Sequence, residues 1–158
     1  MQQGVQRTSL QDIADKLGIT KPALYYHFAS REELVRSILV PLIDEGEQFV
    51  EDQESRGDIE ARELLEGYFD FHYRHRHDLI LVLAEISMLA DLGLIDKVLA
   101  WRDRLGKLVF GPRPTLAQST RAVVAFGGLQ DCCLQFPDTR YKELRARSVE
   151  AALAALGV

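Results

Sequence analysis

The stretch that most constrains the fold of this chain is residues 20–28, whose pattern predicts a short helix with one buried face. Thr20 is a residue type that caps helix starts, and Pro22 stands in the first turn, where a missing backbone N–H costs nothing. Leu24 and Phe28 are four residues apart and therefore share one face. The other faces are expected to point outward, and they carry Lys21, Pro22, Tyr25 and Tyr26.

A second short helix is expected immediately before this one. Ser9 and Asp12 have the spacing of a capping box, and small and apolar residues then recur at helical spacing, namely Leu10, Ile13, Ala14 and Leu17. Gly18 is the residue type that ends a helix by taking up a left-handed backbone. Two short helices joined by one sharp turn form a helix-turn-helix, the motif that places its second helix in the major groove of DNA.

These residues resemble the DNA-binding domain of the TetR family of one-component transcriptional regulators. Three runs carry the resemblance, residues 8–14, 17–28 and 30–34, and it covers about residues 4–39. It implies an all-α fold with a helix-turn-helix DNA-binding domain over residues 1–42 and a helical effector-binding and dimerisation domain over residues 43–158. The function it implies is that of a DNA-binding transcriptional regulator, a ligand-responsive repressor that binds a palindromic operator as a homodimer and is not an enzyme.

The sequence departs from the family pattern at its start. The family has a further helix before the glycine that corresponds to Gly4, and only Met1, Gln2 and Gln3 precede it here. That helix normally covers the apolar side chains that here are Ile13, Leu17 and Leu24, and exposing one fully costs roughly 1.5 to 3 kcal/mol. We therefore expect either that the natural protein begins upstream or that this form binds DNA weakly.

The candidate DNA contacts follow from helix geometry and from the resemblance. The start of the recognition helix enters the major groove, so Lys21 is a candidate for a guanine edge or, equally, for a phosphate, and Ala23 for a thymine methyl group. The resemblance implies phosphate and sugar contacts for Tyr25, Tyr26 and His27, although His27 could instead bond within the domain and one tyrosine could be half-buried. The full candidate set is Thr8, Ser9, Thr20, Lys21, Pro22, Ala23, Tyr25, Tyr26, His27 and Arg31.

The next helix is predicted to begin with a capping box formed by Ser30 and Glu33. Pro41 falls inside it and predicts a kink or break around residues 37–41, because proline removes one backbone hydrogen bond and clashes with the carbonyl four residues back. The kink would serve either to move the recognition helix or merely to bend the helix around the core. Residues 51–58 are polar and charged and are predicted to form a loop.

The remainder is predicted to be helical, since no segment alternates convincingly at a period of two. Breaks are indicated by glycine, proline and polar stretches. The expected helices span about residues 58–75, 78–91, 94–110, 115–135 and 138–156.

The last two expected helices, 115–135 and 138–156, carry more apolar surface than one buried stripe needs. The first has Leu116, Val123, Gly127 and Leu134 on one side and Ala122, Phe126, Leu129 and Cys133 on another, and the second carries small residues that allow close helix packing. In the family this pair of helices forms the homodimer interface, and the resemblance implies the same role here.

The effector site is expected among the middle helices, where the family has its pocket. Apolar and aromatic side chains would form its walls and Glu85 and Gln130 its polar contacts, which suits a small, largely apolar effector of unknown identity. Any one of these residues could equally be ordinary core. The candidates are Phe69, His72, Tyr73, Glu85, Met88, Trp101, Leu105, Phe126 and Gln130.

No cofactor and no metal are expected. His72 and His75 have acceptable chelating spacing and His77 is near, but no cysteine completes a zinc pattern, so a solvated helix end is the better interpretation. Cys132 and Cys133 are adjacent in a predicted helix and cannot pair in ordinary helical geometry. They are expected to be small buried hydrophobes, with a redox sensor across the dimer axis as a weaker alternative.

The net charge of −5 argues against nucleic-acid binding when taken alone. Residues 1–40, however, hold five basic and four acidic side chains, so this part is +1 and the remainder −6. A cytoplasmic protein is expected, because no stretch of eighteen apolar residues and no signal-peptide pattern occurs. Two alternatives remain: an all-α enzyme using Glu85 and His72, with no motif to support it, and a truncated TetR-like dimerisation partner that binds an effector or a relative but not DNA.

Overall fold

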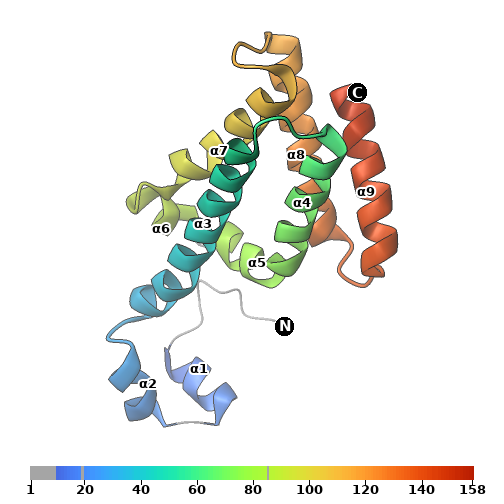
Figure 1. The fold of residues 1–158 in the computed structure, drawn as a ribbon. Coiled ribbons are helices and arrows are strands. Elements are labelled where there is room, and N and C mark those ends of the chain that lie inside the picture. Colours follow the sequence, from blue (N-terminus) through green and yellow to red (C-terminus); the bar gives the residue numbers. More distant parts are fainter. Residues whose placement is uncertain (1–9, 19, 85) are drawn as a thin grey trace.

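The computed structural model describes residues 10–18, 20–84 and 86–158, and these residues form helices joined by short connections (Figure 1). The all-α fold expected from the sequence is therefore found. The helices are α1 (Leu10–Leu17), α2 (Lys21–His27), α3 (Arg31–Arg56), α4 (Ala61–Arg74), α5 (Arg76–Ala84), α6 (Ile86–Asp91), α7 (Leu94–Phe110), α8 (Leu116–Gln135) and α9 (Tyr141–Leu156).

Helices α1 and α2 form a small unit at one end of the molecule, connected to the body through α3 (Figure 1). Ala14 of α1 and Leu24 of α2 are buried against each other, and Phe28 and Leu34 pack on them. The two helices are close because the residue at the crossing, Ala14, is small. This is the predicted helix-turn-helix, with Gly18 at a φ of 67° after α1.

Helix α3 is longer than the sequence indicated. It runs without interruption from Arg31 to Arg56 and includes Pro41, so the break considered at residues 37–41 is absent. The loop predicted for residues 51–58 is also wrong over most of its length, because the helix ends only at Gly57. The polar character of this last part reflects solvent exposure on one side, while Val50 and Gln53 are buried on the other. The predicted domain boundary between residues 42 and 43 lies within this helix.

The body is a bundle in which α8 packs on α9, α4 and α7, while α3 packs on α7 and α5. Figure 1 shows α4, α8 and α9 side by side at the end of the molecule away from α1 and α2. The centre of the bundle is filled by side chains with less than two per cent exposure, among them Phe69, Leu105, Phe126 and Leu129. Helix boundaries expected for the body agree closely with α4, α7, α8 and α9. The stretch expected as one helix over 78–91 is described as α5 and α6, with residue 85 outside the described residues.

No helix among the described residues is long and apolar enough to span a lipid bilayer.

Candidate nucleic-acid interface and effector site

The start of α2 is fixed by its own sequence. The Thr20 hydroxyl accepts a hydrogen bond from the Ala23 backbone N–H at 3.3 Å, and Pro22 lies in the first turn as expected. Leu24 is buried on the inner face of the helix. These contacts hold α2 against α1 and leave the rest of its surface open to solvent.

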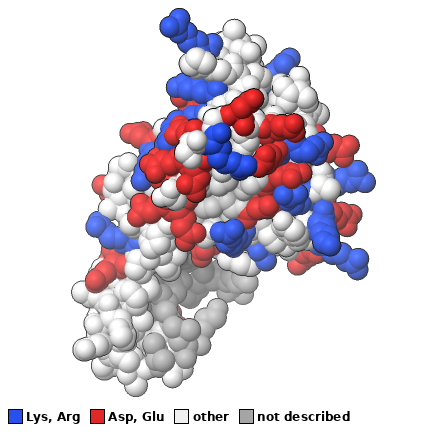
Figure 2. Space-filling view, in the orientation of Figure 1, with Lys and Arg blue, Asp and Glu red and all other residues white. Residues whose placement is uncertain are grey.

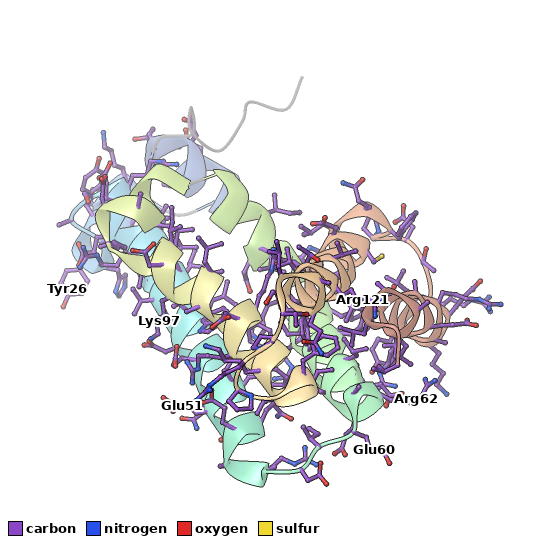
Figure 3. The ribbon with its side chains drawn as sticks, turned by 90° about the horizontal axis from the view of Figure 1, so that it is seen from above. Tyr26, Glu51, Glu60, Arg62, Lys97 and Arg121 are labelled. Carbon is purple, nitrogen blue, oxygen red and sulfur yellow. The ribbon has the colours of Figure 1, made fainter. Side chains whose placement is uncertain are left out.

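The outer surface of α2 carries the predicted recognition residues. Lys21, Pro22, Ala23 and His27 are exposed, and Tyr26 is 86% exposed and points away from the body (Figure 3). Tyr25 is less open, at 45%, and its ring lies 5.5 Å from the Lys21 ammonium group, close enough for a cation–π contact. Apart from an edge contact with the His27 ring, at 5.2 Å between centroids, the Tyr26 phenol lies in solvent and is available for an external partner.

The N-terminus of α3 lies directly after α2 and is held by its own side chains. The Ser30 hydroxyl accepts a hydrogen bond from the Glu33 N–H at 3.1 Å, while the Glu33 carboxylate accepts one from the N–H of Ala29 at 2.6 Å. The predicted capping box is therefore altered in one bond: the Glu33 carboxylate binds the N–H of Ala29, where a capping box has the N–H of Ser30. The pKa of Glu32 is lowered by a hydrogen bond from its own backbone N–H and by Ser30. Arg31 makes contacts of its own at this site.

Charge is distributed unevenly over the molecule. Figure 2 shows that the visible face of the α1 and α2 unit has few Lys, Arg, Asp or Glu side chains, whereas acidic and basic side chains crowd the body. The Lys21 ammonium is the one basic side chain of α2 other than His27.

Four predicted site residues lie wholly or partly outside the part of the chain that the structure describes. Thr8, Ser9 and Glu85 lie outside the described residues, and the side chain of Met88, in α6, is likewise outside them. The remaining candidates for the effector site do not converge on one open cavity. Phe69, Leu105 and Phe126 are completely buried within the main core.

His72 is buried, 3% exposed, and its Nδ1 lies 2.9 Å from the Tyr68 carbonyl oxygen. Burial lowers the pKa of His72 to about 4, so the ring is neutral at neutral pH. The predicted solvated helix end is therefore wrong for this residue. His75 instead lies 3.1 Å from the Glu45 carboxylate of α3 and 3.7 Å from Asp78. Within the described residues, no group of three or more His, Cys, Asp and Glu side chains could hold a metal ion.

The remaining effector candidates contact other parts of the fold. Tyr73 stacks on Phe69, with ring centroids 5.7 Å apart, and the Arg76 guanidinium lies 4.2 Å from the centroid of the Tyr73 ring. Trp101 is buried against α3, where its indole N–H donates to the Glu47 carboxylate at 2.9 Å. Gln130 of α8 accepts a hydrogen bond from Arg102 of α7 at 2.8 Å.

A network of charged groups joins α3 to α7. Arg104 binds Glu47 and also Glu54, the latter through two hydrogen bonds of 2.8 and 2.6 Å. Burial raises the pKa of Glu47, but hydrogen bonds from Arg104 and Trp101 outweigh it and lower the pKa below its ordinary value. Lys97, labelled in Figure 3 on α7, lies 3.6 Å from Asp44 of α3. The network fixes the part of α3 that lies away from α1 and α2.

Two residues of this region were not singled out from the sequence, Arg102 and Glu47. Nothing in their local pattern distinguishes them from solvated charges on a helix surface. Their partners come from other helices, 28 residues away for Arg102 and 54 for Glu47. Only the packing of α7 on α8 and of α3 on α7 brings the pairs together.

The face of α8 and α9 away from the core is apolar and open. Of the two predicted faces of α8, the one carrying Ala122, Phe126, Leu129 and Cys133 is buried, while Leu116 and Val123 on the other are 82% and 52% exposed. Val124 is 63% exposed and lines a groove between α8 and α9 whose walls are mostly small residues, including Gly128, Cys132, Ser148, Ala151 and Ala155. Cys133 is buried, and burial raises the pKa of its thiol to about 12. Cys132 is half-buried, and neither cysteine forms a disulfide.

Comparison with known proteins bears on the N-terminal part and on the fold. Residues 1–38 match the family model of bacterial regulatory proteins, tetR family. The HTH-type transcriptional regulator TtgR of Pseudomonas putida is 37% identical over 57 residues, which are 36% of this chain and 27% of that protein. The HTH-type transcriptional repressor KstR2 of Mycobacterium tuberculosis is 44% identical over 43 residues, 27% of this chain and 22% of the relative.

The chain thus matches about a quarter of the length of these curated relatives. A solved structure extends the likeness to the body. The TetR family transcriptional regulator PfmR from Thermus thermophilus superposes with a TM-score of 0.62, covering 96% of this chain and 89% of that one at 20% identity. At that identity the likeness establishes a shared fold.

Proposed function

We propose that this chain is a transcriptional regulator of the TetR family that binds operator DNA through α2, because residues 1–38 match the model of that family of bacterial regulatory proteins. The observation that carries the proposal is the outer surface of α2. Lys21, Ala23 and Tyr26 are exposed on a helix whose inner face is held by Leu24. An exposed lysine, a small methyl-bearing residue and a solvated phenol are groups that read bases and contact phosphates in the major groove.

A homodimer that reads a palindromic operator is the second part of the proposal. It is supported by the open apolar face of α8 and α9, where Leu116 and Val124 are exposed. Two copies joined there would present two recognition helices related by a two-fold axis, which matches a palindromic site. We propose repression as the mode of action, consistent with the relative described as a repressor.

Response to a small effector is the third part. It is supported by the network through which Arg104 and Trp101 of α7 hold Glu47 of α3. A ligand that displaces α7 would alter the position of α3, which continues to the DNA-reading end. We assign the effector to the middle helices of the body.

The experiment that tests DNA binding is a titration of the purified protein against the intergenic DNA upstream of its own coding sequence. It is run at low and at physiological salt, with a random duplex as control. Preference for the upstream sequence that survives physiological salt is the expected result. Equal affinity for both duplexes, with the dimer intact, would contradict the proposal.

The role of Lys21 is tested by Lys21→Ala measured against a set of operator variants. Loss of a base contact is expected to cost about 1 to 3 kcal/mol and to relax the preference at one base pair. Uniform weakening across all variants would instead make Lys21 a phosphate contact.

A second candidate function is favoured by the sparse charge on the visible face of the α1 and α2 unit (Figure 2). In this alternative the chain pairs with a full-length relative through α8 and α9 and does not itself read DNA. The titration distinguishes the two functions: a dimeric protein without sequence preference, which nevertheless removes a relative from its operator, would support the alternative.

A further inference from the structure

A half-buried cation lies beside an apolar groove between α7 and α8. The groove has a volume of about 160 Å³, and its walls are mainly apolar, with Leu99 and Gly106 on α7, Ala122 and Val123 on α8, and Pro114 in the connection between them. Gly106 and Ala122 approach closely at its floor, since a Cβ atom on Gly106 would lie 3.0 Å from that of Ala122. The polar lining consists of Arg102, Asp103 and Ser119.

The Arg102 side chain lies at the groove wall and reaches across to α8. One of its terminal nitrogens donates to the Gln130 side-chain oxygen at 2.8 Å, and the guanidinium lies over Gly127 of α8. Its charge also acts on the phenol of Tyr68, whose pKa burial raises to about 12 although Arg102 opposes that rise. Both of these partners, the Gln130 amide and the protonated phenol, are neutral.

Other half-buried arginines in this fold have anionic partners. Arg104 holds Glu47 and Glu54, and Arg145 holds Asp70 and Glu66. Arg102, in contrast, forms no ion pair with any carboxylate among the described residues, although it is as deeply placed. The acidic residue nearest along the chain, Asp103, is bound by Lys107 at 2.6 Å. A guanidinium withdrawn from water without a counter-charge is costly, and binding an anion would offset that cost.

We propose that this groove binds a small organic monocarboxylate, with the carboxylate on the Arg102 guanidinium and the apolar part between Leu99 and Val123. The guanidinium fork matches a carboxylate, and the mainly apolar walls suit a hydrocarbon body. The volume sets the size of the ligand, because a cavity of roughly 150 Å³ takes up benzene. The ligand class is therefore a benzoate-sized aromatic or branched aliphatic acid. The inference rests on the proposed effector response and names its chemistry.

The test measures binding of benzoate, with benzamide as the neutral analogue of the same shape, by calorimetry on the purified full chain. Wild-type protein is expected to bind benzoate at least about tenfold more tightly than benzamide, the loss that follows when a hydrogen-bonded charge is removed from a ligand. Equal affinity for the two compounds, or no binding of benzoate, would overturn the proposal.

Three variants locate the site. Arg102→Met should abolish the preference for benzoate, whereas Arg113→Gln, which removes an exposed charge beside Pro114 at the mouth of the groove, should retain it. Val123→Trp should block both compounds, because Val123 is 52% exposed and a larger side chain there can fill the groove without entering the core. Retained benzoate binding in Arg102→Met or in Val123→Trp would contradict the assignment. Each variant's thermal unfolding is compared with wild type, and Val123→Trp keeps the test valid if Arg102→Met does not fold.

Two further readouts separate this inference from its premise. Operator titration with and without benzoate is run on the same preparations, so that intact DNA binding without benzoate binding refutes the site alone. Benzoate binding without operator preference would instead refute the DNA-binding function and leave the site standing. A second copy of the chain could occupy the groove instead of a ligand, and light scattering on Val123→Trp tests this. A change from dimer to monomer would show that the groove is part of an interface and would overturn the proposal.

Discussion

The side chain of His72 shows how a single residue can be misjudged from sequence. Its spacing to His75 indicated a chelating pair or a solvated helix end, but the ring is 3% exposed and bonded to the Tyr68 carbonyl. Burial is a property of the packed bundle and cannot be obtained from a pattern of three histidines. By contrast, Thr20, Leu24 and Ser30 were assigned correctly, because capping and helical periodicity depend only on neighbours within a few residues.

The neutral state of His72 makes the stability of the fold depend on pH. The pKa of His72 is about 4 in the folded protein and 6.5 when the side chain is exposed. On acidification His72 therefore becomes protonated in the unfolded chain while it stays neutral in the folded protein. The contribution of His72 to stability is therefore complete at a pH above 6.5, its pKa in the unfolded chain. It is lost as the pH falls toward about 4, its pKa in the folded protein. Between about pH 7 and about pH 5 the loss from this group should be about 2 kcal/mol.

Urea unfolding of wild type and His72→Gln at both pH values measures that contribution. The variant should show a smaller difference between the two pH values, and His77→Gln, which alters an exposed histidine on the next helix, should leave the wild-type difference unchanged. An identical pH dependence in wild type and His72→Gln would mean that other groups cause the loss.

Among the helices, α3 departs most from its sequence-based prediction. Pro41 indicated a break and the charged residues 51–58 indicated a loop. The helix nevertheless includes Pro41 and continues to Arg56. Its charged second half is held by contacts that only the tertiary structure supplies, chiefly Arg104 of α7 bound to Glu47 and Glu54. Local propensity was overridden here because these partners lie on another helix. The boundaries of α7 were predictable because Gly93 precedes the helix and Gly111 follows it.

The close contact of α3 with α7 depends on the absence of a side chain at Gly46. A Cβ atom there would overlap the outer edge of the Trp101 ring, so Gly46→Ala must displace the indole and strain its bond to Glu47. We expect a loss of about 1 to 3 kcal/mol in the free energy of unfolding. Gly67→Ala is the control, because its Cβ would meet only the edge of the Phe49 ring at 3.2 Å. Equal stability of the two variants, measured by chemical denaturation, would contradict this role for Gly46.

Pro41 is expected to weaken α3 even though it does not interrupt it. Proline cannot donate the backbone hydrogen bond that an interior helical residue makes, and Pro41 is exposed, so Pro41→Ala removes no core contact. The variant should be more stable than wild type by about 1 to 3 kcal/mol in thermal unfolding. A less stable variant would show that the ring itself supports the native packing. If effector response is also unchanged, the proline has no role in signalling.

At the scale of the whole molecule, the sequence indicated an all-helical body and two apolar faces on α8, and both are found. It could not indicate that most candidate effector residues are core, since buried aromatic side chains of a pocket and of a core have the same pattern. The groove beside Arg102 is likewise a product of how α7 crosses α8. Sequence therefore predicts the type of molecule better than the position of its ligand site.

The proposed dimer is tested by placing a charge on its apolar face. Val124 is 63% exposed on α8, so Val124→Glu should leave the fold of the single chain intact and convert the dimer to a monomer. Ile80→Glu is the matched control, since Ile80 is 55% exposed on α5. Sedimentation equilibrium gives the mass of each variant. A dimeric Val124→Glu protein with unchanged affinity would place the interface elsewhere.

The unbroken course of α3 has a consequence for how accurately the molecule must be assembled to read DNA. Its 26 residues give a rod about 39 Å long, with the recognition helix at one end and the contacts of Arg104 near the other. A rotation of about 5° about the Arg104 end would carry the Arg31 end through about 3.4 Å, the axial rise of one base pair. In the proposed dimer, the angular precision of the α3–α7 contact would therefore set the register in which the two copies of α2 meet the two halves of an operator.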